Sequence, residues 1–285
     1  MENAVLKATG LVKNYGGTRA LDGLELELPQ GKIVGLLGPN GSGKTTFLKI
    51  AAGLLTPSAG EVTVCGGKIG PETKAVVSYL PDKTYLNRQQ RICEILDFFQ
   101  DFYADFDRTR AEEMLSVLHI DPNAKLKTLS KGNQEKVQLV LVMSRRARLY
   151  LLDEPIGGVD PAARDYILST IITNYDPSAT VLISTHLIAE VADLIEHTVI
   201  IRKGRILQDA PTEELTAACW AVSGPAGVVD SWAAGRDVFT SSVLGGLKTV
   251  CIRGGGTEDL PAGLERRRVG LQEYFISLME EEDQR

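Results

Sequence analysis

The chain has 285 residues and a formal net charge of −6, from 31 Lys and Arg residues against 37 Asp and Glu residues. Hydrophobic residues make up 44% and charged residues 24%, which is close to the average for folded domains and excludes wholesale disorder and fibrous classes. Because this balance lacks the global basic footprint of nucleic-acid-binding proteins, we expect no nucleic-acid partner.

The first elements in chain order are strands that have one solvated face. Residues 4–11 and 24–28 alternate apolar and polar side chains, which is the period of a half-buried strand. Residues 32–37 form an apolar run instead, and a glycine-rich loop and a helical pattern over residues 47–55 follow it. We therefore expect antiparallel strands first, and then a buried strand, a loop and a helix.

Two later segments have the character of buried core strands. Residues 149–152 and 180–184 are apolar runs, and a helical pattern follows each of them. Buried runs that alternate with helices are typical of a parallel sheet. No apolar stretch in the sequence approaches the ~20 residues that cross a bilayer, so a role at a membrane would need a partner protein.

The segment between the glycine loop and the second core strand predicts a helical subdomain over about residues 87–148. Its apolar residues recur at helical spacing, and it carries few strand signals. Close to its end lie three basic residues, Arg145, Arg146 and Arg148, which predict a solvated face or, as the alternative, a contact with a partner.

The composition shifts after about Pro211 toward small residues. Residues 247–252 form a short alternating run, and residues 271–279 have the spacing of an amphipathic helix. We therefore expect a main domain over residues 1–211 and a small α+β accessory unit over residues 212–285.

The glycine loop carries the first chemistry. It reads Gly38, Pro39, Asn40, Gly41, Ser42, Gly43, Lys44, Thr45 and Thr46. This matches Gly-x-x-x-x-Gly-Lys-Thr, the phosphate-binding loop (Walker A), in which bare backbone amides and a helix N-terminus surround phosphate groups. The pattern predicts that Lys44 reaches the β- and γ-phosphates and that the Thr45 hydroxyl ligates Mg²⁺.

Two carboxylates, Asp153 and Glu154, end the second core strand. An Asp at the mouth of a buried strand can hold Mg²⁺, and a Glu beside it can orient and deprotonate a water molecule. Acidic residues after a strand are also typical of helix caps. The preceding phosphate loop favours the catalytic interpretation.

The order of these motifs over residues 4–210 resembles the nucleotide-binding subunit of an ATP-binding cassette (ABC) transporter. Tyr15 lies where the family has an aromatic residue that stacks on adenine. Ser130 and Gly132 belong to a segment that resembles the family's signature motif. Asp160 lies in a segment similar to the loop that crosses to the other protomer, and His186 ends the next strand as the family's switch histidine does.

The resemblance implies an α/β phosphate-loop NTPase with a parallel core sheet, an antiparallel β subdomain and a helical subdomain. It also implies an ATPase that uses ATP and Mg²⁺, with Glu154 as the base and Lys44 and His186 contacting the phosphates or the water. Each ATP would lie between the phosphate loop of one subunit and the signature of the other, in a head-to-tail homodimer or heterodimer. The chain would drive a separate transmembrane permease, in the manner of small exporter-type subunits, from the cytoplasmic face of the membrane.

The chain departs from the family pattern at three positions. Lys131 replaces the first signature glycine, and Asn133 replaces the signature glutamine. Asp82 lies where the family usually has a glutamine, and we expect its carboxylate either to bind Mg²⁺ through water or to face the partner. Tyr15 could also be an ordinary aromatic residue on a β surface, and His186 could be a capping or core histidine.

A soluble nucleotide-dependent switch that does not couple to transport is the alternative function. Ribosome-associated cassette proteins usually carry two cassettes, and the DNA-repair members carry long coiled coils or zinc cysteines. This sequence has one cassette, no heptad array and no zinc spacing. The transporter subunit is therefore the favoured interpretation.

Overall fold

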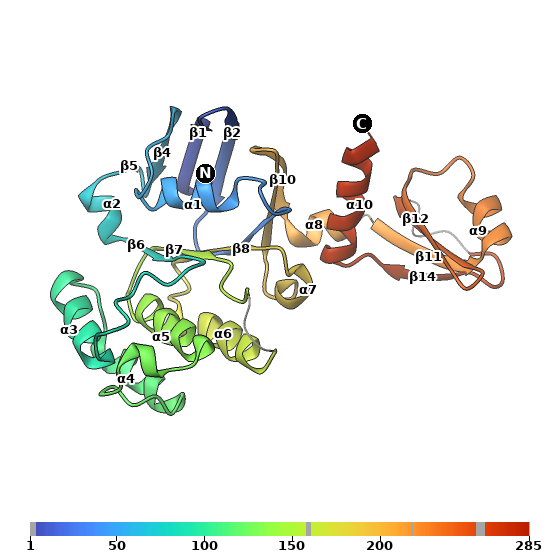
Figure 1. The fold of residues 1–285 in the computed structure, drawn as a ribbon. Helices are drawn as coiled ribbons and strands as arrows, with labels where there is room; N and C mark the ends of the chain where they lie inside the picture. Colours follow the sequence, from blue (N-terminus) through green and yellow to red (C-terminus); the bar gives the residue numbers. More distant parts are fainter. Residues whose placement is uncertain (1–3, 158–160, 218, 255–259, 285) are drawn as a thin grey trace. The chain divides into compact units, whose positions relative to one another are not determined.

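A computed structural model describes residues 4–157, 161–217, 219–254 and 260–284. The chain divides into two compact units (Figure 1). The first unit comprises residues 1–187 and 197–209, and the second comprises residues 188–196 and 210–285.

A four-stranded antiparallel sheet opens the first unit, in the order β2-β1-β4-β5. Its strands are β1 (Ala4–Tyr15), β2 (Thr18–Pro29), β4 (Ala59–Val64) and β5 (Gly67–Lys68). Buried and exposed residues alternate along much of β2, as expected for a sheet with one solvated face. The predicted antiparallel strands are confirmed, and both are longer than their sequence patterns.

The core of the first unit is a six-stranded sheet in the order β10-β9-β3-β8-β7-β6. Its strands are β3 (Ile33–Leu37), β6 (Val77–Leu80), β7 (Leu149–Asp153), β8 (Thr180–Thr185), β9 (His197–Arg202) and β10 (Arg205–Pro211). The ladders from β9 through β3, β8 and β7 to β6 are all parallel. Every residue of β3, β7 and β8 is buried, which explains why these strands are continuous apolar runs.

Helices surround this sheet and fill the predicted helical region (Figure 1). They are α1 (Lys44–Ala51), α2 (Pro71–Ala75), α3 (Ile92–Phe102), α4 (Arg108–Val117), the 3₁₀ helix η1 (Leu126–Thr128), α5 (Lys131–Met143) and α6 (Pro161–Asn174). No helix in the described ranges is both long and apolar enough to cross a membrane.

The predicted solvated face near residue 145 is wrong for one of its three arginines. Arg146 and Arg148 are exposed, but Arg145 is only 3% exposed. Its guanidinium donates to both carboxylate oxygens of Asp105, at 3.0 and 3.1 Å, and to the Val77 carbonyl at 2.6 Å. The Cζ atom of this guanidinium lies 3.9 Å from the centre of the Tyr103 ring. Arg145 therefore joins the helical region to the core sheet, a role that sequence spacing does not reveal.

The second unit is built on an antiparallel sheet in the order β12-β13-β11-β14. Its elements are α7 (Ile188–Val191), α8 (Thr212–Ala217), β11 (Cys219–Pro225), α9 (Ala226–Ala233), β12 (Val238–Leu244), β13 (Leu247–Arg253), β14 (Glu265–Arg268) and α10 (Leu271–Gln284). The expected fold class, an α/β phosphate-loop domain with antiparallel and helical parts followed by an α+β region, is confirmed.

Candidate nucleotide site

The site forms where neighbouring parallel strands end at the same edge of the core sheet. Leu37, the last residue of β3, pairs with Thr185 at the end of β8. Asp153, the last residue of β7, pairs with Ser184 of β8. Because adjacent parallel strands finish together, the segments that follow them converge on one place. The glycine loop, the two carboxylates and His186 are therefore brought together.

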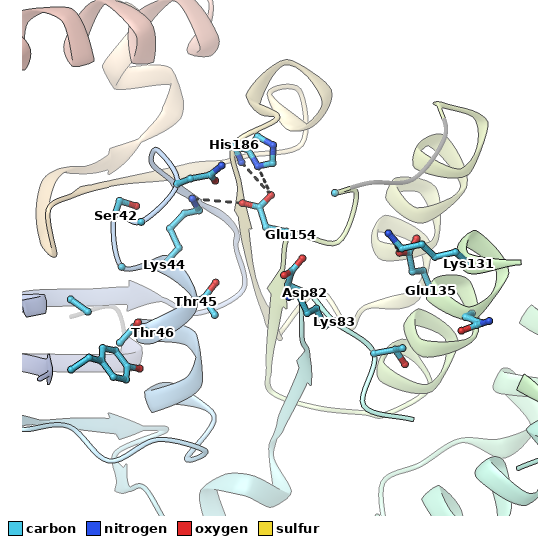
Figure 2. Close-up of a pocket in the computed structure, with 18 residues that line it drawn as sticks. Ser42, Lys44, Thr45, Thr46, Asp82, Lys83, Lys131, Glu135, Glu154 and His186 are labelled. Atoms are coloured by element: carbon cyan, nitrogen blue, oxygen red, sulfur yellow. Dashed lines mark hydrogen bonds and ion pairs between the residues drawn. The ribbon is translucent and has the colours of Figure 1, made fainter. Parts of the chain in front are cut away.

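A pocket of about 980 Å³ occupies this edge (Figure 2). Its lining residues are Tyr15, Ala20, Asn40, Gly41, Ser42, Gly43, Lys44, Thr45, Thr46, Asp82, Lys83, Thr84, Lys131, Gln134, Glu135, Glu154, Gly157 and His186. Most of the residues singled out in the sequence are among them. The volume is within the usual range for a small-molecule site.

The glycine loop holds its shape through a left-handed backbone at Gly43 and through close packing. Gly43 has φ of +113°, and a Cβ there would lie 2.7 Å from the Ala20 carbonyl oxygen. A Cβ at Gly38 would lie 2.3 Å from the Ile201 carbonyl oxygen. Glycine is required at both places, and α1 begins immediately after Gly43 with its first amides unpaired within the helix.

Lys44 folds back over its own loop. The ammonium donates to the Gly38 carbonyl at 2.7 Å and to the Pro39 carbonyl at 3.3 Å, and it lies 3.6 Å from Glu154 Oε1. Lys44 is 6% exposed, and this burial lowers the pKa of its amine, while the nearby carboxylates oppose the shift. Because the two carbonyl partners are neutral, an anion would compensate the buried charge of Lys44 better than they do.

Asp153 is 1% exposed and is not among the lining residues, but it contacts Thr45, which is one of them. Its Oδ1 accepts from the Ser184 hydroxyl at 2.7 Å and from the Thr45 hydroxyl at 3.1 Å, whereas no described residue donates to the buried Oδ2. Burial raises the pKa of this carboxyl, and the neighbouring charge of Asp82 adds to the shift. A buried carboxylate oxygen without a donor, next to a threonine hydroxyl, fits a divalent cation.

Glu154 turns away from the strand axis. It has φ of +51°, a left-handed conformation that is uncommon for a residue with a Cβ. Its amide donates to the carbonyl oxygen of Ser184 at 3.0 Å, and its Oε2 lies 2.9 Å from Nδ1 of His186. Figure 2 shows the carboxylate between Lys44 and His186. The side chain is 13% exposed, so it still reaches the pocket.

Two further predicted residues lie at the pocket edge. Tyr15 ends β1 and is 48% exposed, with the Lys13 ammonium 5.4 Å from the centre of its ring. A ring with an exposed face can stack on a flat base. Asp82 follows β6 and is exposed on the pocket wall. Among the residues described, no group of three His, Cys, Asp or Glu could hold a metal, so a cation here would also need hydroxyl, water or ligand oxygens.

The structure does not bring every predicted residue into this pocket. Ser130 caps the N-terminus of α5 by accepting from the Asn133 amide at 3.3 Å, and neither Ser130 nor Gly132 is among the lining residues. Gly38 and Pro39 do not line the pocket either, but their carbonyl oxygens accept hydrogen bonds from the ammonium of Lys44, which does line it. Asp160 lies outside the described residues.

Lys131 and Glu135 lie one turn apart on α5 and line the far wall of the pocket, a position that the sequence does not predict. The Lys131 ammonium lies 3.6 Å from Glu135 Oε1, and burial raises the pKa of the Glu135 carboxyl. Their i, i+4 spacing predicts that they share a helix face. It does not predict that this face lines the pocket, because that depends on how α5 packs against the core sheet.

Comparisons with known proteins agree with this geometry. The family model described as ABC transporter matches residues 21–157. An uncharacterized ABC transporter ATP-binding protein of Methanocaldococcus jannaschii is 32% identical over 74% of this chain and 79% of its own. The Nod factor export ATP-binding protein I of Cupriavidus metallidurans is 30% identical over 74% of this chain and 73% of its own.

A solved structure of the ATP-binding subunit of an ABC transporter covers 74% of this chain and 91% of its own, with a TM-score of 0.67 and 27% identity. The fold, the phosphate loop and the two strand-end carboxylates thus occur together in a chain similar to known cassette subunits. The chain belongs to the ATP-binding subunits of ABC transporters and is an ABC transporter ATPase.

Proposed function

We propose that this chain hydrolyses Mg-ATP in a head-to-tail dimer and thereby drives export through a separate membrane-spanning subunit. The observation that carries the chemistry is the Glu154 carboxylate, which lies 3.6 Å from the Lys44 ammonium and 2.9 Å from His186. A base next to the phosphate-binding cation and a histidine is the arrangement that attack of water on a γ-phosphate requires.

The loop residues Asn40 to Thr46 bind the phosphates of ATP in this proposal. Their backbone amides and the N-terminus of α1 offer donors that match phosphate oxygens. Lys44 exchanges its contacts with the Gly38 and Pro39 carbonyls for the β- and γ-phosphates. Tyr15 stacks on the adenine from the edge of the antiparallel sheet.

Thr45 and Asp153 are the proposed holders of Mg²⁺, with Asp82 contributing through water from the opposite wall. The buried Asp153 Oδ2 without a described donor supports this assignment. When bound, the cation would offset the charge of the phosphates and of these carboxylates. Asp82 could instead face the partner subunit, as its exposed position allows.

Glu154 is the proposed general base. Its left-handed backbone directs the carboxylate into the pocket, where Oε2 contacts His186 and remains free to accept a proton from a water molecule. His186 holds the carboxylate in this orientation through Nδ1 and then contacts the γ-phosphate or the water. Lys44 limits the repulsion between Glu154 and the phosphates.

Ser130 and Gly132 serve the nucleotide of the other subunit in the proposed dimer. They stand at the N-terminus of α5, where helix amides favour an anion, but they do not line the pocket of their own chain. A phosphate bound by a second subunit could use these donors. Asp160 is the proposed residue of the loop that crosses to that subunit, which is either a second copy or a related chain.

An exposed aromatic patch on α3 supports contact with a membrane-spanning subunit. Phe98 and Phe102 are 57% and 68% exposed, and their rings stack with centroids 5.8 Å apart. Exposed stacked rings of this kind mark a surface that a partner covers. The printed name of the Nod factor export relative supports export as the direction. The chain would then lie at the cytoplasmic face of the membrane.

We assign nucleotide chemistry to residues 1–211 and an accessory role to residues 212–285. Every residue that lines the pocket comes before position 187, which supports this division. Removing residues 212–285 should therefore leave ATP binding measurable.

Sedimentation of the Glu154→Gln variant tests the dimer directly. The variant should form more dimer with Mg-ATP than with Mg-ADP, because the γ-phosphate joins the two subunits and is not hydrolysed. His119→Gln, a substitution at a residue outside the pocket, is the control. If Glu154→Gln binds ATP but sediments identically with either nucleotide, the sandwich dimer is wrong for this chain.

A further inference from the structure

The sheet of the second unit has two unlike edges. One edge is β14, whose four residues, Glu265, Arg266, Arg267 and Arg268, are all charged and exposed. The other is β12, which reads Val-Phe-Thr-Ser-Ser-Val-Leu from Val238 to Leu244 and carries no charge. Charged residues on an edge strand prevent pairing with another strand. The β14 edge is protected in this way, and the β12 edge is not.

The unprotected edge ends in an exposed apolar hairpin. Val243 is 65% exposed, Leu244 is 85% exposed, and Leu247 after the turn is 57% exposed. Gly245 and Gly246 form the turn with φ of +57° and +84°. Three large apolar side chains at one hairpin tip are more than the isolated surface residues that folded proteins commonly show.

The helices of this unit pack against the faces of the sheet, and α10 reaches β12 itself. On one face, Val229 and Trp232 of α9 pack against Val222 and Val250. On the other face, Glu273 of α10 contacts Cys251 and Arg267. The ring of Tyr274 on α10 also packs against Phe239 of β12, with centroids 6.5 Å apart, and Glu280 accepts from the Thr240 hydroxyl. Among the strands described, only β13 pairs with β12. In the described part of this sheet, β12 is therefore an end strand, and its outer backbone groups pair with no strand described.

The sequence of β12 fits a second copy of itself. A bulge interrupts its pairing with β13 between Val238 and Thr240, and the regular part, Thr240–Leu244, is centred on Ser242. Antiparallel pairing about a two-fold axis at Ser242 sets Ser241 against Val243, and Thr240 against Leu244, of the other copy. No two like charges meet, and both apolar tips come to lie against the neighbouring strand.

The charges near the hairpin disfavour a lipid surface as the occupant. Lys248, the basic residue next to the tip, is ion-paired with Asp230 rather than held free for anionic headgroups. The uncharged sequence also extends along the strand beyond the tip, which a lipid contact would not require. A strand of neutral residues is what edge-to-edge addition uses.

We propose that the second units of two copies of this chain pair through β12, forming a continuous eight-stranded antiparallel sheet. The contact is independent of ATP, because no residue that lines the nucleotide pocket takes part in it. A five-residue strand pair is weak by itself, but two copies held in one transporter would meet at a high effective concentration. The proposal does not depend on the roles assigned to Lys44 or Glu154.

Disulfide trapping in the full chain tests the pairing. Facing residues of an antiparallel pair have Cα atoms about 4.5–5.5 Å apart, which is within the range of a disulfide. Ser242→Cys should therefore give a covalent dimer on mild oxidation, with the introduced thiols joined to each other in mass spectra of the digested protein. Ser231→Cys, on the exposed surface of α9, is the matched control and should give no more dimer than the wild-type chain.

The same trapping in the Lys44→Ala background separates this proposal from the nucleotide chemistry. The cross-link should persist there with and without ATP, and adding Ser241→Lys, which sets a charge beside the two-fold axis, should abolish it. Equal cross-linking at Ser242→Cys and Ser231→Cys, or none at either, would overturn the proposal. A lipid surface would be the occupant instead if three results came together. The wild-type chain would float with phosphatidylserine vesicles, Leu244→Ser would prevent this flotation, and Ser242→Cys would give no cross-link.

Discussion

The two units of this chain differ in the burial of their charged side chains. Among its described residues, the first unit buries three charged side chains, namely Asp153 at 1% exposure, Arg145 at 3% and Lys44 at 6%. In the part of the second unit that the structure describes, no Asp, Glu, Lys or Arg is buried. Its ion pairs, such as Arg267 with Glu273, remain at the surface.

Removing a charge from water costs several kcal/mol, so a buried charge needs a compensating reason. For Lys44 and Asp153 the proposed reason is the nucleotide, because Lys44 lines the pocket and Asp153 contacts Thr45 beside it. For Arg145 it is structural, because its guanidinium is fully engaged with Asp105 and backbone carbonyls. This difference supports the proposal that the nucleotide chemistry lies in the first unit and that the second unit has an accessory role at its surface. Four substitutions test this difference.

The largest effect is expected for Lys44→Ala. Without the ammonium the β- and γ-phosphates lose their main cation, so ATP hydrolysis should fall below detection and ATP affinity should drop by roughly 10-fold or more. Lys49→Ala, an exposed lysine in the same helix, is the control and should hydrolyse ATP normally. Phosphate release and equilibrium ATP binding measure the two effects. Normal turnover by Lys44→Ala would refute the phosphate-loop assignment.

Arg145→Met should cause the next largest effect, a loss of stability. The substitution leaves the Val77 carbonyl and the partly buried Asp105 carboxylate without their donor, and losing such partners typically costs about 1–3 kcal/mol. Urea unfolding measures the free energy of unfolding. Arg146→Met, at the exposed neighbour, should change it by less than about 1 kcal/mol. Equal effects of the two substitutions would show that the burial of Arg145 has no energetic consequence.

Asp153→Asn should make the stability of the nucleotide-free chain less dependent on pH. Burial raises the pKa of this carboxyl in the folded state above its ordinary value of 3.8. The protonated form is therefore favoured by folding, and this contribution is fully present at low pH and is lost as pH rises through the folded pKa. The amide cannot ionise, so the variant should gain stability relative to wild type as pH rises.

Unfolding of both proteins in EDTA between about pH 4 and pH 8 checks this sign. With Mg²⁺ and ATP present the order should reverse, because the variant loses the carboxylate that the cation needs. Parallel pH profiles for the two proteins would mean that Asp153 titrates alike in the folded and unfolded chains.

The smallest effect is expected for Arg267→Met in the second unit. The guanidinium forms a bidentate pair with Glu273, with nitrogen to oxygen distances of 2.6 and 2.8 Å, but the arginine side chain is 59% exposed. Exposed pairs contribute about 0–1 kcal/mol. Unfolding by urea should detect little change, and ATP hydrolysis should be unaltered. A loss comparable with that of Arg145→Met would contradict the contrast between the units.

The sequence predicts the motif residues of the candidate site better than it predicts side-chain contacts. The phosphate loop, Asp153 and Glu154 were found because continuous apolar strands end in residues with characteristic chemistry, and adjacent parallel strands must end together. The burial of Arg145 and the position of Lys131 were not predictable in this way. Both depend on how the helices of residues 87–148 pack against the sheet, and local spacing does not encode that packing.

The initial rate of phosphate release by Glu154→Gln, measured together with its ATP affinity, tests the central claim most directly. Glutamine keeps the size of the side chain but cannot accept the proton of the attacking water. The rate should fall by roughly 10²–10⁴-fold while ATP affinity stays within a few-fold of wild type, as expected for a general base. A variant that binds ATP and hydrolyses it at the wild-type rate would contradict the account.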